Sequence, residues 1–126
     1  MRVLAAPDKF RGSLTAVEAA NAIETAVKKC GGISINAPMA DGGEGTLQVL
    51  GGPNRMTTVT GPLGKPIQAE WRLSKKTAVI EMALASGLSV AGGPEINKPL
   101  EATTKGTGEL IRCAMEQGAK RIIVGL

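Results

Sequence analysis

The stretch VLAAPDKFRGSLTAVEAANAIETAVKKCGGISINAP, residues 3–38, determines the fold class. Residues 3–6 form a short apolar run closed by Pro7, which predicts a buried strand. Thr15 and Glu18 form a Thr-x-x-Glu capping box, so a helix is expected to begin there, and Gly31 and Gly32 are expected to end it. Residues 33–38 alternate and end in proline, as a second strand does. The order strand, helix, strand predicts a βαβ unit with a right-handed crossover.

The predicted helix carries apolar residues at spacings of three or four, which is typical of a helix that packs one face against a sheet. The residues of this stripe are Val17, Ala20, Ile23, Val27 and Cys30.

The second half of the chain has a different order of predicted elements. Residues 56–60, 67–73 and 77–82 read as strands separated by turns, which predicts a meander of three strands. Residues 87–100 are loop-like, residues 107–117 predict a helix that ends at Gly118, and residues 121–126 predict a last strand. The residues expected to share the inner face of that helix are Leu110, Ile111, Ala114 and Met115.

These patterns predict an α/β fold in two parts. Residues 1–54 are expected to be the N-terminal part of a Rossmann-like domain with a parallel sheet, and residues 55–126 the start of a second, smaller mixed α/β domain. In open α/β sheets the ligand-binding turns follow the carboxyl ends of strands. The last predicted strand reaches the end of the sequence before such a turn, so we expect an incomplete fold, the N-terminal portion of a longer one; a simple edge strand is the alternative.

Composition narrows the class of function. The chain has 43% hydrophobic residues but one Phe, one Trp and no Tyr, so the core is expected to be aliphatic and stacking on nucleic-acid bases is disfavoured. The formal net charge of +4 suits an anionic small molecule, and no apolar run is long enough to span a membrane. The absence of His excludes Ser-His hydrolases and His-ligated zinc. Two cysteines without a CxxC spacing fit reduced thiols in the cytoplasm.

Polar segments follow the predicted strands. In APDKFRGS, Asp8 and Lys9 lie at the end of the first strand, and Gly12 and Ser13 lie close to a helix N-terminus, where an anion is favoured. An ordinary loop with a surface lysine is the alternative.

The segment ADGGEGT, residues 40–46, follows the second strand. Its glycines, Gly42, Gly43 and Gly45, allow positive φ and an anion-binding nest of amides. Asp41 is suited to hold Mg²⁺ or to accept a proton from a hydroxyl. Glu44 is also explained by its place in the first turn of a following helix, and simple turn chemistry is the alternative for the whole segment.

Two more segments carry candidate groups. Glu81 lies in a strand; strict alternation favours an orientation toward solvent, and an inward carboxylate would need a partner such as Lys9 or Lys105. The segment EATTKGTGE brings hydroxyls and the Lys105 cation to the start of a helix, with plain N-capping by Thr104 or Thr107 as the alternative. Carboxylates, lysines, hydroxyls and glycine turns together suit phosphoryl transfer, in which positioning and charge neutralisation provide most of the catalysis.

The motifs APDKFRGSLTAVEAANAI, PMADGGEGT, VTGPLGKPIQAEW, AVIEMALASGL and ATTKGTGELIRCAMEQGAKRIIVGL resemble, in order and spacing, the bacterial glycerate kinases without a P-loop. The resemblance covers essentially the whole chain and the N-terminal third of the family. It implies ATP-dependent phosphorylation of D-glycerate with Mg²⁺ in the cytoplasm, by two unlike α/β domains with the active site in the cleft between them. Family members are longer and continue after RIIVGL into a glycine-rich, Asp-containing segment. Smaller departures are Arg11, where Lys is usual, and a shortened stretch at residues 50–55.

The resemblance implies two catalytic residues, Asp41 and Lys9. Asp41 is expected to orient or deprotonate the glycerate hydroxyl and to be a candidate ligand of Mg²⁺, and Lys9 to neutralise the transferring phosphoryl group or the substrate carboxylate. The residues implied for substrate or phosphate binding are Asp8, Ser13, Gly42, Gly43, Glu44, Gly45, Thr46, Glu81, Ser86, Thr103, Thr104 and Gly106.

The alternative from another class of function is a non-catalytic α/β module that binds an anionic metabolite or a partner chain. The residue types do not distinguish a 2-phosphate from a 3-phosphate product. An apolar last strand left at a sheet edge also predicts self-association.

Overall fold

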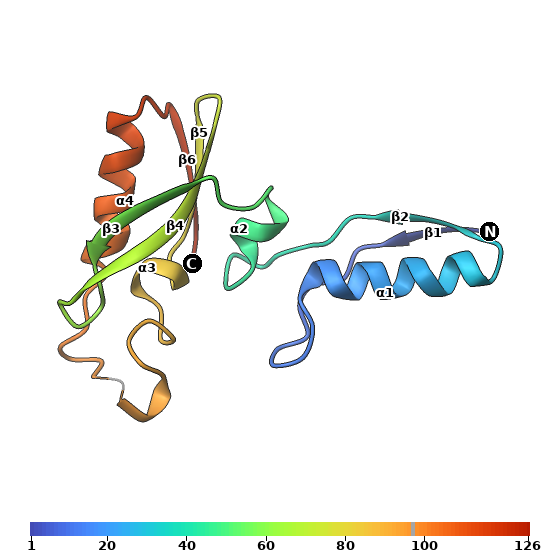
Figure 1. The fold of residues 1–126 in the computed structure, drawn as a ribbon, viewed down its shortest axis with the longest axis horizontal. Coiled ribbons are helices and arrows are strands. Elements are labelled where there is room, and N and C mark those ends of the chain that lie inside the picture. Colours follow the sequence, from blue (N-terminus) through green and yellow to red (C-terminus); the bar gives the residue numbers. More distant parts are fainter. Residues whose placement is uncertain (97) are drawn as a thin grey trace. The chain divides into compact units, whose positions relative to one another are not determined.

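The computed structural model describes residues 1–96 and 98–126, and the chain divides into two compact units, Met1–Asp41 and Gly42–Leu126 (Figure 1). The sequence placed a domain boundary near residue 54. The compact units instead divide before Gly42, because the short helix α2 (Thr46–Val49) contacts strand β5 (Thr77–Glu81) of the second unit. The two domains expected of a longer fold stay a prediction.

The first unit is the predicted βαβ motif. Strands β1 (Arg2–Ala5) and β2 (Ile33–Asn36) pair in parallel, and helix α1 (Ala16–Lys29) connects them. The capping box that begins α1 is confirmed: the Thr15 Oγ1 accepts from the Glu18 N–H at 3.2 Å, and a Glu18 carboxylate oxygen accepts from the Thr15 N–H at 2.8 Å.

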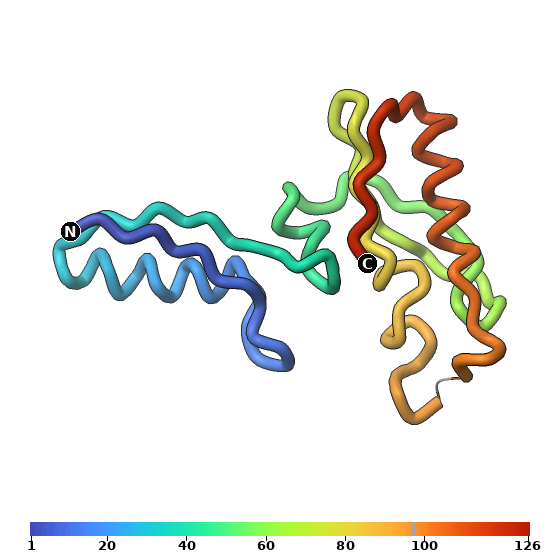
Figure 2. Tube along the Cα trace, turned by 180° about the vertical axis from the view of Figure 1, so that it is seen from behind, coloured from blue at the N-terminus to red at the C-terminus, as the bar shows by residue number. Residues whose placement is uncertain are grey.

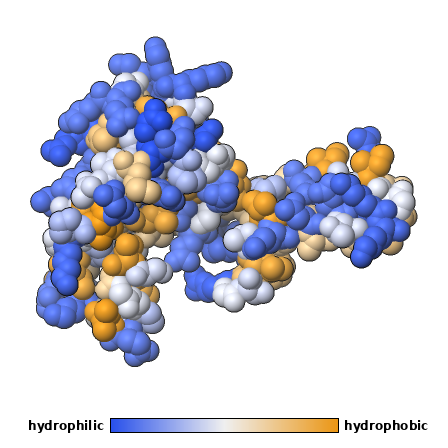
Figure 3. All heavy atoms as spheres, in the orientation of Figure 1, coloured by the Kyte–Doolittle hydropathy of each residue, from blue (hydrophilic) through white to orange (hydrophobic). Residues whose placement is uncertain are grey.

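Burial in the first unit differs from the expectation. Strand β1 was predicted to be buried, but only its Ala5 is, and Leu4 is 65% exposed. Ala20 and Val27 of the predicted stripe of α1 are buried, whereas Ile23 and Cys30 are exposed. A sheet of two strands is narrow and covers only a strip of α1, so apolar side chains, shown in orange, remain at the surface (Figure 3).

The second unit contains the predicted meander. Strands β3 (Arg55–Thr60), β4 (Pro66–Ser74) and β5 pair antiparallel in sequence order, and β6 (Arg121–Gly125) pairs in parallel with β5. Figure 2 shows β6, in red, running beside β5. The helical segments are α3 (Ala83–Ser86), the 3₁₀ turn η1 (Pro94–Ile96) and α4 (Lys105–Glu116).

The core of the second unit lies between the sheet and α4. Trp71, Ile80 and Leu110 are fully buried, and the Trp71 indole N–H donates to the Thr57 hydroxyl at 2.9 Å. The core therefore contains the single Trp as well as the expected aliphatic side chains. Met115 was predicted to face inward but is 61% exposed, because α4 packs through Leu110 and Ala114. Within the described ranges, no helix has the length and apolarity needed to cross a bilayer.

Candidate functional site

The first unit brings together the two predicted catalytic residues, Lys9 and Asp41. The Lys9 Nζ donates to the Asp41 Oδ1 at 3.1 Å. Lys9 follows β1 and Asp41 follows β2, and parallel neighbouring strands have their carboxyl ends at the same edge of the sheet. The Lys9 side chain is 20% exposed and that of Asp41 63%, so water reaches the carboxylate more readily than the ammonium group.

The backbone after the two strands holds this pair in register. The Ala37 N–H donates to the Ala5 carbonyl at 2.7 Å, and the Met39 N–H donates to the Pro7 carbonyl at 2.8 Å, so the two segments stay side by side beyond the strand ends. The loops that carry Lys9 and Asp41 are therefore tied together by main-chain hydrogen bonds as well as by the ion pair.

The other two candidates of the first loop have local roles. Asp8 Oδ1 accepts from the Lys9 N–H at 2.6 Å, which fixes the turn that carries Lys9. Ser13 is exposed in a tight turn, and its N–H donates to the Phe10 carbonyl at 2.9 Å. Thr15, rather than Ser13, caps α1.

The glycine loop, residues 42–46, belongs to the second unit. Gly42 and Gly45 adopt φ of 103° and 93°, the left-handed region predicted for these glycines. Thr46 is buried, and its hydroxyl donates to the Gly43 carbonyl at 2.7 Å, inside the loop. Glu44 is exposed, precedes the N-cap residue Gly45 and accepts from the Ser89 hydroxyl at 3.4 Å. It therefore lies before helix α2, outside the first turn that was the alternative explanation for it.

Glu81 is the main correction to the predicted site. Alternation favoured an orientation toward solvent, yet Glu81 is 3% exposed. Its Oε1 accepts from the Gly45 N–H at 3.2 Å and its Oε2 from the Leu47 N–H at 2.9 Å. The prediction that an inward Glu81 would pair with a lysine is wrong as well. Its partners are backbone amides, and Lys105 pairs with Glu109 at 3.7 Å.

The remaining candidates lie around the start of α4. The Ser86 and Thr107 hydroxyls form a hydrogen bond of 2.8 Å, and Thr103 Oγ1 accepts from the Lys105 N–H at 3.1 Å. Thr104 is the N-cap residue, but its side chain makes no capping bond. Gly106 is buried against β3. Thr107 was noted in the sequence as one of the hydroxyls of this segment, with capping as the alternative, and its contact with Ser86 required the fold.

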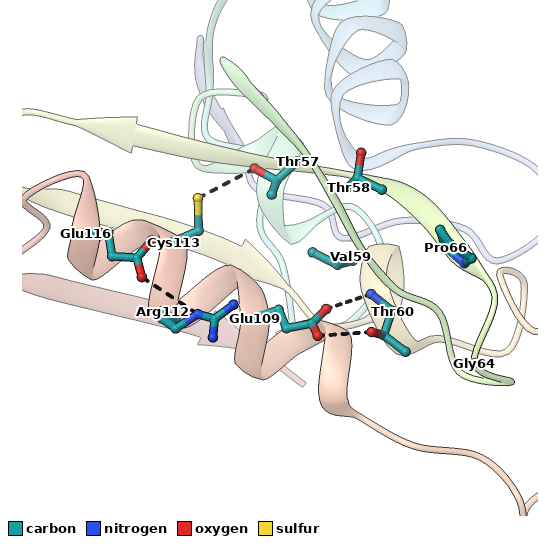
Figure 4. A pocket seen from close by; sticks show the side chains of 10 residues that line it. All are labelled: Thr57, Thr58, Val59, Thr60, Gly64, Pro66, Glu109, Arg112, Cys113 and Glu116. Carbon is teal, nitrogen blue, oxygen red and sulfur yellow. Dashed lines mark hydrogen bonds and ion pairs between the residues drawn. The ribbon is translucent and has the colours of Figure 1, made fainter.

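A groove of ≈ 460 Å³ opens between β3 and α4 (Figure 4). Its polar side chains bond one another: Glu109 accepts from the Thr60 N–H at 2.6 Å and from its hydroxyl at 3.0 Å, and Arg112 pairs with Glu116 at 3.8 Å. The hydrogen bonds from Thr60 hold the pKa of Glu109 below its ordinary value. None of the predicted site residues lines this groove.

The described residues build no metal cage. Across the part of the chain that the structure describes, no three side chains of His, Cys, Asp or Glu cluster in a way that would hold an ion. Mg²⁺ often needs only one or two carboxylates, together with substrate phosphates and water. Asp41 is the carboxylate suited to that limited role, and it already pairs with Lys9.

Known proteins resemble this chain in both sequence and fold. Residues 3–126 match the profile of the glycerate kinase family. A glycerate kinase of Bacillus subtilis is 47% identical over 134 aligned residues, and a glycerate 2-kinase of Escherichia coli is 44% identical; both alignments cover 100% of this chain and 35% of the relative. A crystal structure assigned as glycerate kinase 2 of Salmonella typhimurium superposes with a TM-score of 0.81 at 41% identity, covering 99% of this chain and 36% of that one. The chain thus spans about a third of the length of these relatives.

Proposed function

Because this chain belongs to the glycerate kinase family, we propose that it supplies the N-terminal part of an enzyme that transfers a phosphoryl group from ATP to a hydroxyl of D-glycerate in the cytoplasm. The observation that carries the proposal is the ion pair between Lys9 and Asp41 at the carboxyl ends of two parallel strands. Phosphoryl transfer to an alcohol uses a base for the hydroxyl proton and a cation for the phosphoryl charge. Asp41 and Lys9 are such groups, and one hydrogen bond joins them.

The proposed step assigns each group one task. The glycerate hydroxyl oxygen forms the new bond to the γ-phosphorus, the bond from that phosphorus to the ADP oxygen breaks, and the hydroxyl proton passes to the Asp41 carboxylate. Lys9 then neutralises charge on the transferring phosphoryl group or on the substrate carboxylate. Mg²⁺ would neutralise the phosphates of ATP, and holding it is the alternative task for the Asp41 carboxylate.

The geometry supports unequal roles for the other predicted residues. Asp8 shapes the turn that carries Lys9. Gly42, Gly43 and Glu44 are proposed to face substrate, and so are the hydroxyls of Ser86, Thr103 and Thr104. Thr46 and Gly106 act inside the structure, because both are buried and packed against backbone.

A chimaera tests this function. Residues 1–126 replace the matching N-terminal region of the Bacillus subtilis glycerate kinase, and a coupled assay follows ADP release with D-glycerate, with L-glycerate as the substrate control. We expect turnover, and about 10²-fold or more lower kcat for Asp41→Asn and Lys9→Met. Separating 2-phosphoglycerate from 3-phosphoglycerate identifies the product, a question raised by the relative named glycerate 2-kinase.

The matched control is a second exposed ion pair, Lys98 with Glu101 at 3.3 Å. Lys98→Met and Glu101→Gln should leave turnover unchanged. Near-normal turnover of the Asp41→Asn chimaera would remove Asp41 from the proposed step. A chimaera that binds D-glycerate in calorimetry but never releases ADP would favour the alternative, a module that binds an anionic metabolite.

A further inference from the structure

The glycine loop already holds an anion, the carboxylate of Glu81. Both carboxylate oxygens are used, one by the Gly45 N–H and the other by the Leu47 N–H. We infer that Glu81 is a positioning residue, which fixes the glycine loop for the proposed phosphoryl transfer by occupying the amides that a ligand phosphate would otherwise take. The catalytic part of this inference rests on the proposed function.

Burial makes the two hydrogen bonds to the Glu81 carboxylate energetically important. A carboxylate that is 3% exposed needs strong partners, because moving a charge out of water is costly unless it is paired or hydrogen-bonded. Among the described residues Glu81 makes no ion pair within 4.0 Å, so its compensation comes from the two N–H groups. Hydrogen bonds to a charged acceptor are about twice as strong as neutral ones.

The other end of the loop is held by close packing. A Cβ on Gly125 would lie 2.4 Å from the Gly42 carbonyl oxygen, and one on Gly42 would lie 3.5 Å from the Leu126 N. Gly125 ends β6 and is the register partner of Glu81, which ends β5. The loop is therefore seated on the carboxyl ends of two neighbouring strands, by packing at Gly42 and by the carboxylate at Gly45 and Leu47.

This arrangement limits what the loop offers to a ligand. The amides of Gly45 and Leu47 are occupied, and the Thr46 hydroxyl is turned into the loop. Before Gly45, the Gly43 carbonyl accepts from the Thr46 hydroxyl at 2.7 Å and the Glu44 carboxylate accepts from the Ser89 hydroxyl at 3.4 Å. At the start of α2 the Glu81 carboxylate therefore takes the place that a ligand phosphate was expected to take, and the shape of the loop depends on Glu81.

Amide hydrogen exchange of the 126-residue chain tests the positioning directly. Glu81→Gln keeps the shape of the side chain, but its NH₂ group cannot accept from one of the two amides. We expect exchange at Gly45 or Leu47, or at both, to accelerate about tenfold or more relative to the core amides of Val79 and Ile80. The exposed Glu70→Gln is the matched control and should change neither amide. Unchanged exchange at Gly45 and Leu47, or an equal acceleration at every amide, would overturn the inference.

Chemical rescue in the chimaera tests the consequence for catalysis. Glu81→Ala should lower kcat more than it raises KM for D-glycerate, and added acetate should restore part of kcat, whereas acetamide of the same size should not. Equal effects of acetate and acetamide would reduce Glu81 to a space-filling residue. An inactive unsubstituted chimaera would contradict the proposed function and with it the catalytic part of the inference, while the exchange experiment still decides whether Glu81 fixes the loop.

Discussion

Gly106 packs against Thr60 so closely that a Cβ at Gly106 would lie 2.2 Å from the Thr60 carbonyl oxygen. This contact lays the first turn of α4 against the end of β3. A Cβ at Gly108, two residues further along, would have no neighbour within 4 Å. One helix thus contains a glycine that packing requires and a glycine that it does not.

Alanine substitution should separate the two glycines. We expect Gly106→Ala to lower the free energy of unfolding by about 1–3 kcal/mol, because the methyl group meets backbone rather than a side chain that can turn away. Gly108→Ala should raise it by up to about 1 kcal/mol, because alanine is the better helix former. Urea unfolding followed by Trp71 fluorescence measures both, and equal effects of the two substitutions would contradict this packing.

The pair of Lys9 and Asp41 should matter little for stability. An ion pair with one largely exposed partner contributes about 0–1 kcal/mol, because water screens it. We therefore expect Lys9→Met and Asp41→Asn to change the free energy of unfolding by less than about 1 kcal/mol. Calorimetric unfolding of the 126-residue chain provides the measurement. A large loss of stability would make the pair a structural element and would weaken its assignment to catalysis.

Acid should destabilise the second unit through Glu109. Its pKa is lowered from 4.5, first by the hydrogen bond from the Thr60 N–H and then by that from the Thr60 hydroxyl. A carboxylate with a lowered folded-state pKa stabilises the fold above its unfolded-state pKa and loses that contribution as the pH falls through the folded-state value. The urea concentration at the midpoint of unfolding should therefore decrease as the pH is lowered below 4.5, and it should decrease less steeply in Glu109→Gln.

Trp71 makes this measurement specific to one unit. It is the single Trp of the chain and lies in the core of the second unit, so its fluorescence follows that unit. In the first unit, Glu18 and Glu24 also have lowered pKa values, caused first by the Thr15 N–H and by Lys28 respectively. Amide hydrogen exchange in α1 should detect the stability that the first unit loses in acid through these two carboxylates. Identical pH curves for the unsubstituted chain and Glu109→Gln would contradict the role given to Glu109.

Sequence reasoning worked where the signal was local. The capping box of Thr15 and Glu18 depends on four consecutive residues and appears as predicted. The contact between Lys9 and Asp41 was not predicted, although the βαβ order placed both residues after parallel strands, whose carboxyl ends lie together. The capping box needed no knowledge of the rest of the fold.

Predictions failed where burial depended on distant partners. Alternation misplaced Glu81 because β5 is covered on both faces: Ala78, Val79 and Ile80 are all buried, so period two carries no information there. Its amide partners could not be found from residue types, since every residue except proline has a backbone N–H. The inward prediction for Met115 failed because α4 packs on the core through Leu110 and Ala114 instead.

The outer edge of β6 should promote self-association. Of the strands in the described ranges, only β5 pairs with β6, so the other edge of β6 presents backbone groups beside Ile122, Ile123 and Val124. Unpaired edges with apolar side chains pair with other chains, and a charged residue suppresses this. Ile122 packs on the core, so Ile123 is the position to change. Light scattering at rising concentration should show dimers or larger species for the unsubstituted chain and fewer for Ile123→Lys. Lys120→Gln, just before the strand, is the control, and a strictly monomeric unsubstituted chain would contradict the prediction.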